Sequence, residues 1–99
     1  MIDKPENKSY RLISGSFSPD AARQVLLSLI NHKINFHQLS NWSHRERFGE
    51  DNPAAVKRIE ELSQTREDIA QLLDESVALG LNLRINSNIE IELSPEPST

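Results

Sequence analysis

The chain has 99 residues, a formal net charge of −4 and no cysteine, which allows one domain and excludes disulfides and thiolate metal sites. Apolar residues make up 36% and charged residues 26% of the chain, a balance typical of a globular protein rather than a disordered one. No apolar run is long enough to span a bilayer and the start carries no secretory signal, so we expect a soluble cytoplasmic protein with no membrane partner.

Charge is distributed unevenly along the chain. Residues 1–49 carry seven Lys/Arg and four Asp/Glu, whereas residues 50–99 carry four Lys/Arg and eleven Asp/Glu. Such an asymmetry makes a protein electrically dipolar if the two halves stay apart in the fold. If the halves pack together, positive and negative charges mix on the surface and the dipole is lost. The sequence leaves both outcomes open.

The first predicted elements are a strand and a helix. Residues 1–8 are polar and are predicted to be a mobile end, as are residues 94–99, so the folded domain is expected over 9–93. Residues 9–15 indicate a short strand. Ser18 can cap a helix and Pro19 suits its first position, so we predict a helix over 19–32 with apolar residues three and four apart.

The next segment permits two interpretations. Ile34 and Phe36 alternate with polar residues, which predicts a second strand over 33–39. The alternative extends the first helix through Leu39. Farther on, Ser43 and Glu46 have the spacing of a capping box, and one helical turn is predicted over 44–48.

A long amphipathic helix is predicted over 53–79, begun by Asn52-Pro53 and ended by Gly80. Its 27 residues would span about 40 Å. Residues 63–68 contain no apolar side chain, so the helix either overhangs the core there or breaks. We favour a continuous helix and leave the break open.

The end of the chain predicts a β-hairpin. Strands over 81–86 and 89–93 around an Asn86-Ser87-Asn88 loop would place Ile85 opposite Ile89 and Leu83 opposite Ile91. The same register sets Arg84 opposite Glu90. The predicted fold is therefore α+β: a small single-layer sheet (strands 9–15, 33–39, 81–86 and 89–93) covered on one face by two main helices (19–32 and 53–79).

The loop predicted from Trp42 to Phe48 is the leading candidate for a functional surface, because it places two aromatic residues around a histidine and two arginines. With the polar middle of the long helix it predicts a non-catalytic protein-interaction or regulatory module of unidentified partner. Self-association through the long helix is a further hypothesis. The predicted surface comprises Trp42, His44, Arg45, Arg47, Phe48 and Arg66.

Two other functions use the same region. RNA or single-stranded DNA could bind through Lys33, Trp42, Arg45 and Arg47, and binding would then weaken steeply with salt. A small hydrolase or metal-dependent enzyme could use His37 and His44. The spacing of His32, His37 and His44 matches no metal signature, and no nucleophile or phosphate-loop motif is present, so we predict no metal, no cofactor and no catalytic residue.

Overall fold

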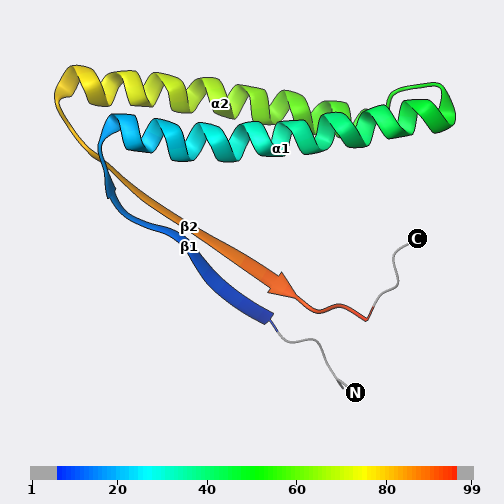
Figure 1. Ribbon diagram of the computed structural model, residues 1–99, viewed down its shortest axis with the longest axis horizontal. Coiled ribbons are helices and arrows are strands. Elements are labelled where there is room, and N and C mark those ends of the chain that lie inside the picture. Colours follow the sequence, from blue (N-terminus) through cyan, green and yellow to red (C-terminus); the bar gives the residue numbers. More distant parts are fainter. Residues whose placement is uncertain (1–6, 96–99) are drawn as a thin grey trace. The chain divides into compact units, whose positions relative to one another are not determined.

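Two long helices and two strands make up the part of the chain that the structure describes. The computed structural model describes residues 7–95 and holds, in chain order, β1 (Asn7–Phe17), α1 (Pro19–Phe48), α2 (Pro53–Leu79) and β2 (Leu83–Glu92) (Figure 1). The chain divides into two compact units, a helical hairpin over Phe17–Leu83 and a β ribbon formed by the segments before and after it. The predicted α+β class is confirmed. The predicted single domain over 9–93 and the covering of the sheet by the helices stay predictions.

Local signals in the sequence set both ends of α1. The Ser18 hydroxyl accepts a hydrogen bond from the Ala21 N–H at 3.2 Å, and Pro19 occupies the first turn, where no N–H is needed. At the other end Gly49 adopts φ +76°, and its N–H donates to the Arg45 carbonyl at 2.7 Å. Between Pro19 and Gly49 the sequence contains neither glycine nor proline, so nothing interrupts the 30-residue helix.

The same logic governs α2, which begins and ends where the sequence predicts. Asn52 accepts a hydrogen bond from the Ala54 N–H at 3.0 Å, and Gly80 ends the helix with φ +68°. The helix is continuous through residues 63–68. There Arg66 is half-buried and donates a hydrogen bond of 2.7 Å to the Asn31 side chain of α1, so a polar contact occupies the position where the apolar stripe is interrupted.

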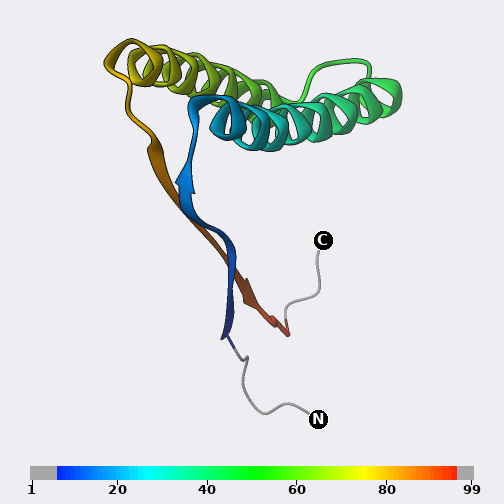
Figure 2. The ribbon, with the colours of Figure 1, turned by 60° about the vertical axis from the view of Figure 1, so that its left-hand side comes forward.

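The two helices pack antiparallel, side by side along their length (Figures 1 and 2). Arg23 near the start of α1 meets Asp74 near the end of α2, and Asn31 meets Arg66. Leu73 is fully buried between them. The buried apolar side chains of the described residues are few: Ala22, Ile34, Ala55, Leu62 and Leu73.

The predicted strand over 33–39 and the separate turn over 44–48 are wrong, because α1 runs through both. Ile34 is buried, whereas Phe36 is 61% exposed. In a strand these two residues would share a face, but in a helix two residues apart they point in different directions. Apolar and polar residues alternate here by chance, on different sides of one helix. The alternative prediction of one extended helix describes the segment better.

β1 and β2 form an antiparallel two-stranded sheet. β1 begins at Asn7, two residues earlier than predicted. Of the predicted mobile ends, residues 94–95 follow β2 without regular structure, and 1–6 and 96–99 lie outside the described residues. Ser14 of β1 and Asn86 of β2 lie beside each other, with Oγ 3.4 Å from Oδ1. In the first half of β2, half-buried Leu83 and Ile85 alternate with exposed Arg84 and Asn86, as predicted for a one-sided strand.

The predicted closing hairpin is wrong, because residues 83–92 form one continuous strand. A three-residue loop at Asn86-Ser87-Asn88 would need a left-handed residue, and within the described chain only glycines have positive φ. The eleven-residue β1 offers β2 a longer partner than a five-residue half of itself could. More backbone groups are therefore paired in the observed arrangement.

Folding brings the basic and acidic halves of the chain together. α1 carries four Lys/Arg and two Asp/Glu, whereas its neighbour α2 carries three Lys/Arg and six Asp/Glu. β1, whose only charged residues are cations, pairs with β2, which holds two glutamates. Within each unit, opposite net charges lie on adjacent elements, which favours mixing of the charges over a simple separation.

Candidate interaction surface on the first helix

The predicted Trp42–Phe48 segment forms the last two turns of α1 rather than a loop. Residues six apart in a helix lie about 120° apart around its axis, so the two aromatic side chains do not form one cluster. Both are largely exposed, Trp42 by 60% and Phe48 by 63%. The structure therefore divides the predicted surface into two sides.

Trp42 lies on one side with charged neighbours. A shallow depression is lined by Trp42, Arg45, Glu46 and Gly49, residues that share a helix face at spacings of three, four and seven. Arg45 also contacts the next segment, with Nε 3.4 Å from Asp51 Oδ1. The indole is thus framed by one cation and one carboxylate.

Phe48 lies on another side with His44 and Arg47. The His44 and Phe48 ring centroids are 4.7 Å apart, and the Arg47 guanidinium carbon lies 5.8 Å from the Phe48 ring centre. His44 Nδ1 is 2.9 Å from the carbonyl oxygen of Glu50, which can only accept, so Nδ1 donates the hydrogen. His44 therefore holds the connection between the helices as well as touching Phe48.

Asn41 organises the four residues that connect the helices. Its Nδ2 donates to Asp51 Oδ1 at 3.1 Å, and its Oδ1 accepts from the Asn52 N–H at 2.8 Å. Asn52 in turn caps α2. The side chains of Asn41, His44 and Asn52 thus close the turn at this end of the hairpin.

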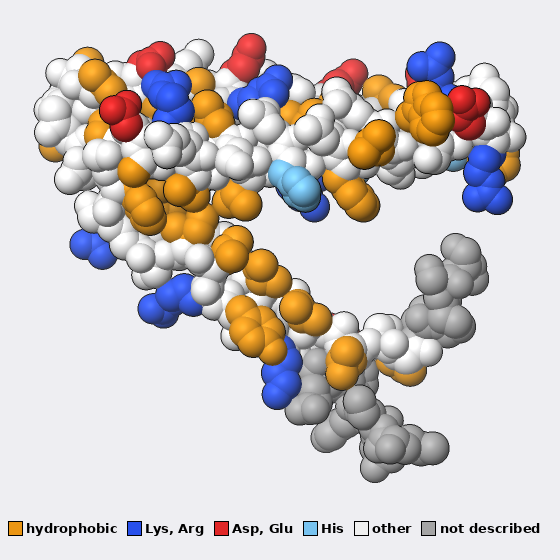
Figure 3. All heavy atoms as spheres, in the orientation of Figure 1, with side chains coloured by type: hydrophobic (Ala, Val, Ile, Leu, Met, Phe, Trp, Pro, Cys, Tyr) orange, Lys and Arg blue, Asp and Glu red, His pale blue; other side chains and the backbone are white. Residues whose placement is uncertain are grey.

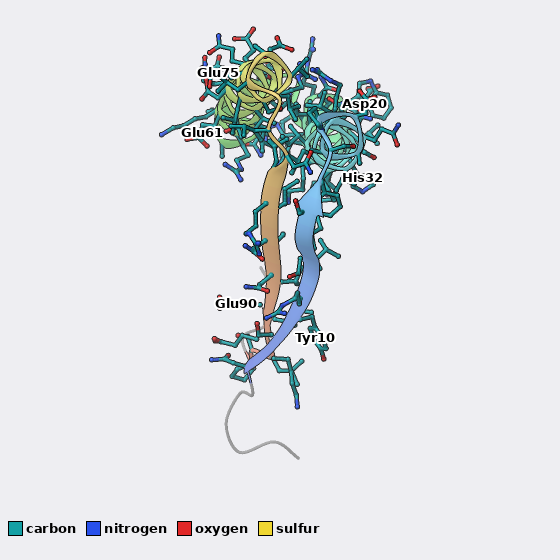
Figure 4. All side chains as sticks on the ribbon, turned by 90° about the vertical axis from the view of Figure 1, so that its left-hand side faces the viewer. Tyr10, Asp20, His32, Glu61, Glu75 and Glu90 are labelled. Atoms are coloured by element: carbon teal, nitrogen blue, oxygen red, sulfur yellow. The ribbon has the colours of Figure 1, made fainter. Side chains whose placement is uncertain are left out.

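A row of exposed apolar side chains extends back from Trp42 along α1. Leu29, Phe36 and Leu39 are 40%, 61% and 67% exposed, and steps of seven, three and three residues lead from Leu29 to Trp42. Successive members lie about 20°, 60° and 60° apart around the axis, so the row winds around α1. His32, one turn before Phe36 on this side, projects from α1 away from α2 (Figure 4). We name the row Leu29, Phe36, Leu39 and Trp42 the α1 stripe.

The charge around the α1 stripe is mainly positive. The Lys33 ammonium lies 5.9 Å from the centre of the Phe36 ring. Arg45 and Arg47 stand near the far end, with Glu46 as the acidic neighbour. Phe36 and Leu39 were not predicted as part of a surface, because both were assigned to the strand over 33–39; continuing the helical period past residue 32 would have found both.

Other predicted residues do not join the stripe. Arg66 is engaged between the helices with Asn31. His37 meets the edge of the Phe36 ring at 5.3 Å, while His44 faces the turn. In residues 7–95 no group of three His, Asp or Glu side chains is close enough to hold a metal ion, so the three histidines do not converge on one site.

Comparisons with known proteins give no family for this chain: no family model matches it, and neither characterised proteins nor solved structures give a significant match. Among the described helices, neither is long and apolar enough to cross a membrane. The function must therefore be argued from the residues themselves.

Proposed function

We propose that the protein is a non-catalytic interaction module that docks another protein on the α1 stripe. The observation that supports it is the exposure of four large apolar side chains on α1, each within about 60° of the next around the helix axis. Single exposed apolar residues are ordinary, but a contiguous row points to a binding surface. Since the chain has no cysteine, we place the module in a reducing compartment such as the cytoplasm.

The chemistry of the stripe favours an acidic, amphipathic partner. A helix laid along α1 would bury its apolar residues against Phe36 and Leu39 and reach Lys33, Arg45 and Arg47 with carboxylates at its margins. Burial of an aromatic anchor contributes most of the affinity at such surfaces, while marginal charges speed encounter and select the partner. Trp42 is the natural anchor at the end of the stripe.

The single tryptophan provides the test. The probe is a synthetic amphipathic helix with leucines on one face and glutamates on the other, and its control has lysines for the glutamates. We expect the acidic peptide to shift Trp42 emission to the blue and to shield it from acrylamide, and the basic peptide to do neither. No response to the acidic peptide, or equal responses to both, would contradict the proposal.

Variants locate the surface. Leu39→Ser should weaken binding of the acidic peptide about tenfold, because it removes an apolar contact at the centre of the stripe. Gln64→Ser, at an exposed polar site on α2, is the matched control and should leave binding unchanged. Equal affinity of both variants would place the peptide elsewhere.

Capture from lysate then tests the natural partner. Wild-type protein and the Trp42→Ala/Arg47→Ala variant are compared, and proteins lost only with the variant are tested for direct binding. Nucleic acid is the competing outcome. If single-stranded oligonucleotides bind with a steep loss as salt rises, and the acidic peptide does not bind, the interaction module is replaced by a nucleic-acid-binding protein.

A further inference from the structure

The β ribbon leaves backbone groups unpaired along both of its sides. Its described part contains two strands, so β1 and β2 each have one edge without a strand beside it. A lone two-stranded ribbon is marginally stable in water, and an open edge is a ready template for another strand. What each edge accepts depends on its own residues.

The edge of β1 is unsuited to a copy of itself. Its charged residues, Lys8 and Arg11, are both cations, so a second β1 would bring like charges together. Gly15, within the strand, has φ +147°, outside the conformations of a regular strand. Positive charge and irregularity are the features by which natural edges avoid pairing.

The edge of β2 has the opposite character. It contains no glycine or proline, and it carries both signs of charge, with Arg84 near its start and Glu90 and Glu92 near its end. In Figure 4, Glu90 lies on the β2 side of the ribbon and Tyr10 on the β1 side. A regular strand with its cation and anions at opposite ends matches an antiparallel copy of itself.

The residue pattern of β2 is self-complementary about Ser87. Antiparallel pairing of two copies centred there sets Leu83 opposite Ile91 and Ile85 opposite Ile89. The same register sets Arg84 of each copy opposite Glu90 of the other. Because such an interface is isologous, each contact occurs twice. The alternation of residues about Ser87 that predicted a hairpin within one chain is thus matched by pairing between two chains.

Exposure along β2 agrees with this register. Leu83 and Ile85 in the first half are half-buried, whereas Ile89 and Ile91 are 41% and 49% exposed. Hydrophobic side chains form a row along the ribbon in Figure 3. Antiparallel pairing about Ser87 brings the exposed half of each strand beside the half-buried half of the other, which lengthens the apolar face.

We infer that β2 pairs with β2 of a second copy, centred on Ser87, to give a four-stranded sheet in the order β1-β2-β2-β1 and a symmetric dimer. The inference does not depend on the docking function of the α1 stripe. It adds that the module is bivalent, because each dimer carries two stripes. A partner with two binding segments would then gain avidity from the dimer.

A charge exchange tests the pairing by sedimentation of the full chain over a wide range of concentration. Arg84→Glu should weaken self-association about tenfold or more, since it opposes two carboxylates twice in each dimer. Adding Glu90→Arg should restore it. Arg11→Glu changes the net charge equally on the other strand and should have little effect. A monomer throughout, or a dimer insensitive to Arg84→Glu, as one formed through α2 would be, overturns the inference.

A single cysteine tests the register. The chain has no native cysteine, so Ser87→Cys would face only its own copy, at the Cα separation that a disulfide needs. We expect rapid formation of a disulfide-linked dimer on mild oxidation, and much slower formation for Ser16→Cys on β1. Equal rates would overturn the pairing. Restoration of the Arg84→Glu variant by Glu92→Arg alone would overturn the Ser87 register in favour of one centred on Asn88.

Discussion

The helical hairpin and the β ribbon satisfy their backbone groups in different ways. Each helix of the hairpin closes its hydrogen bonds within itself, and capping residues with a polar turn complete its ends. In residues 7–95 the ribbon pairs one edge of each strand and leaves the other without a neighbouring strand. A hairpin can therefore be a stable unit with a small core, whereas a ribbon of two strands depends on what covers its edges. The contrast suggests that stability resides in the first and association in the second.

The largest expected difference between the two regions concerns apolar truncation. Leu73→Ala removes a fully buried side chain from the hairpin and should lower the free energy of unfolding by about 2–5 kcal/mol. Ile91→Ala in the half-exposed end of the ribbon should cost less than about 1 kcal/mol in dilute solution. Urea unfolding followed by helical circular dichroism measures both. Leu72→Ala, an exposed neighbour of Leu73, is the control, and equal losses at 73 and 91 would end the contrast.

The second comparison concerns two asparagines with side-chain hydrogen bonds. Asn41→Ala leaves the part-buried Asn52 N–H without its partner and leaves Asp51 Oδ1 with Arg45 alone, so we expect a loss of about 1–3 kcal/mol. Asn86→Ala removes one long, exposed contact to Ser14 and should change stability by less than about 0.5 kcal/mol. Thermal unfolding of the two variants decides it. A larger loss at Asn86 would show that the ribbon contributes to stability as much as the turn.

A substitution of Gly49 tests whether the left-handed backbone conformation at the end of α1 contributes to the stability of the hairpin. Gly49 has φ +76°, and a Cβ there would meet no atom within 4 Å, so the cost of a side chain is conformational alone. Gly49→Ala should lower the free energy of unfolding by about 1–2 kcal/mol. Gly49→Asn should cost clearly less, because asparagine tolerates this backbone conformation better. Identical losses would mean that an unforeseen contact, not the backbone, sets the cost.

What the sequence could predict depends on the range of each signal. Both ends of α2 and the start of α1 follow from caps and prolines within a few residues. The end of α1 was missed because Ile34 and Phe36 imitate a strand over a window too short to separate the two periods. Asparagine-rich residues 86–88 imitate a turn in the same way. In both places the chain forms a longer element, α1 or β2, than the local pattern predicts. The length of β2 depends on its partner β1, which lies far away in the sequence, so no local pattern could predict it.

The candidate site shows the same limit. Trp42 was identified by residue type, and its exposure was then found in the structure. Arg66 was predicted on the surface and lies between the helices, because its partner Asn31 is 35 positions away. Phe36 and Leu39 became part of a surface only once α1 was known to be continuous. Residue chemistry could be anticipated, but the side of the helix on which each residue lies could not.

The smallest expected effect is the coupling free energy of two ion pairs, one in the hairpin and one in the ribbon. The two couplings are expected to differ in their dependence on protein concentration rather than in their size. Arg23 and Asp74 join the helices at 3.0 Å with side chains that are 41% and 76% exposed, so a double-mutant cycle of Arg23→Gln and Asp74→Asn should give a coupling of about 0.2–1 kcal/mol that falls with salt. It should be the same at every protein concentration. The cycle of Arg84→Gln and Glu90→Gln should show a coupling that grows with concentration, because its partners belong to different copies. A constant coupling in both cycles would place Arg84 and Glu90 in contact within one chain.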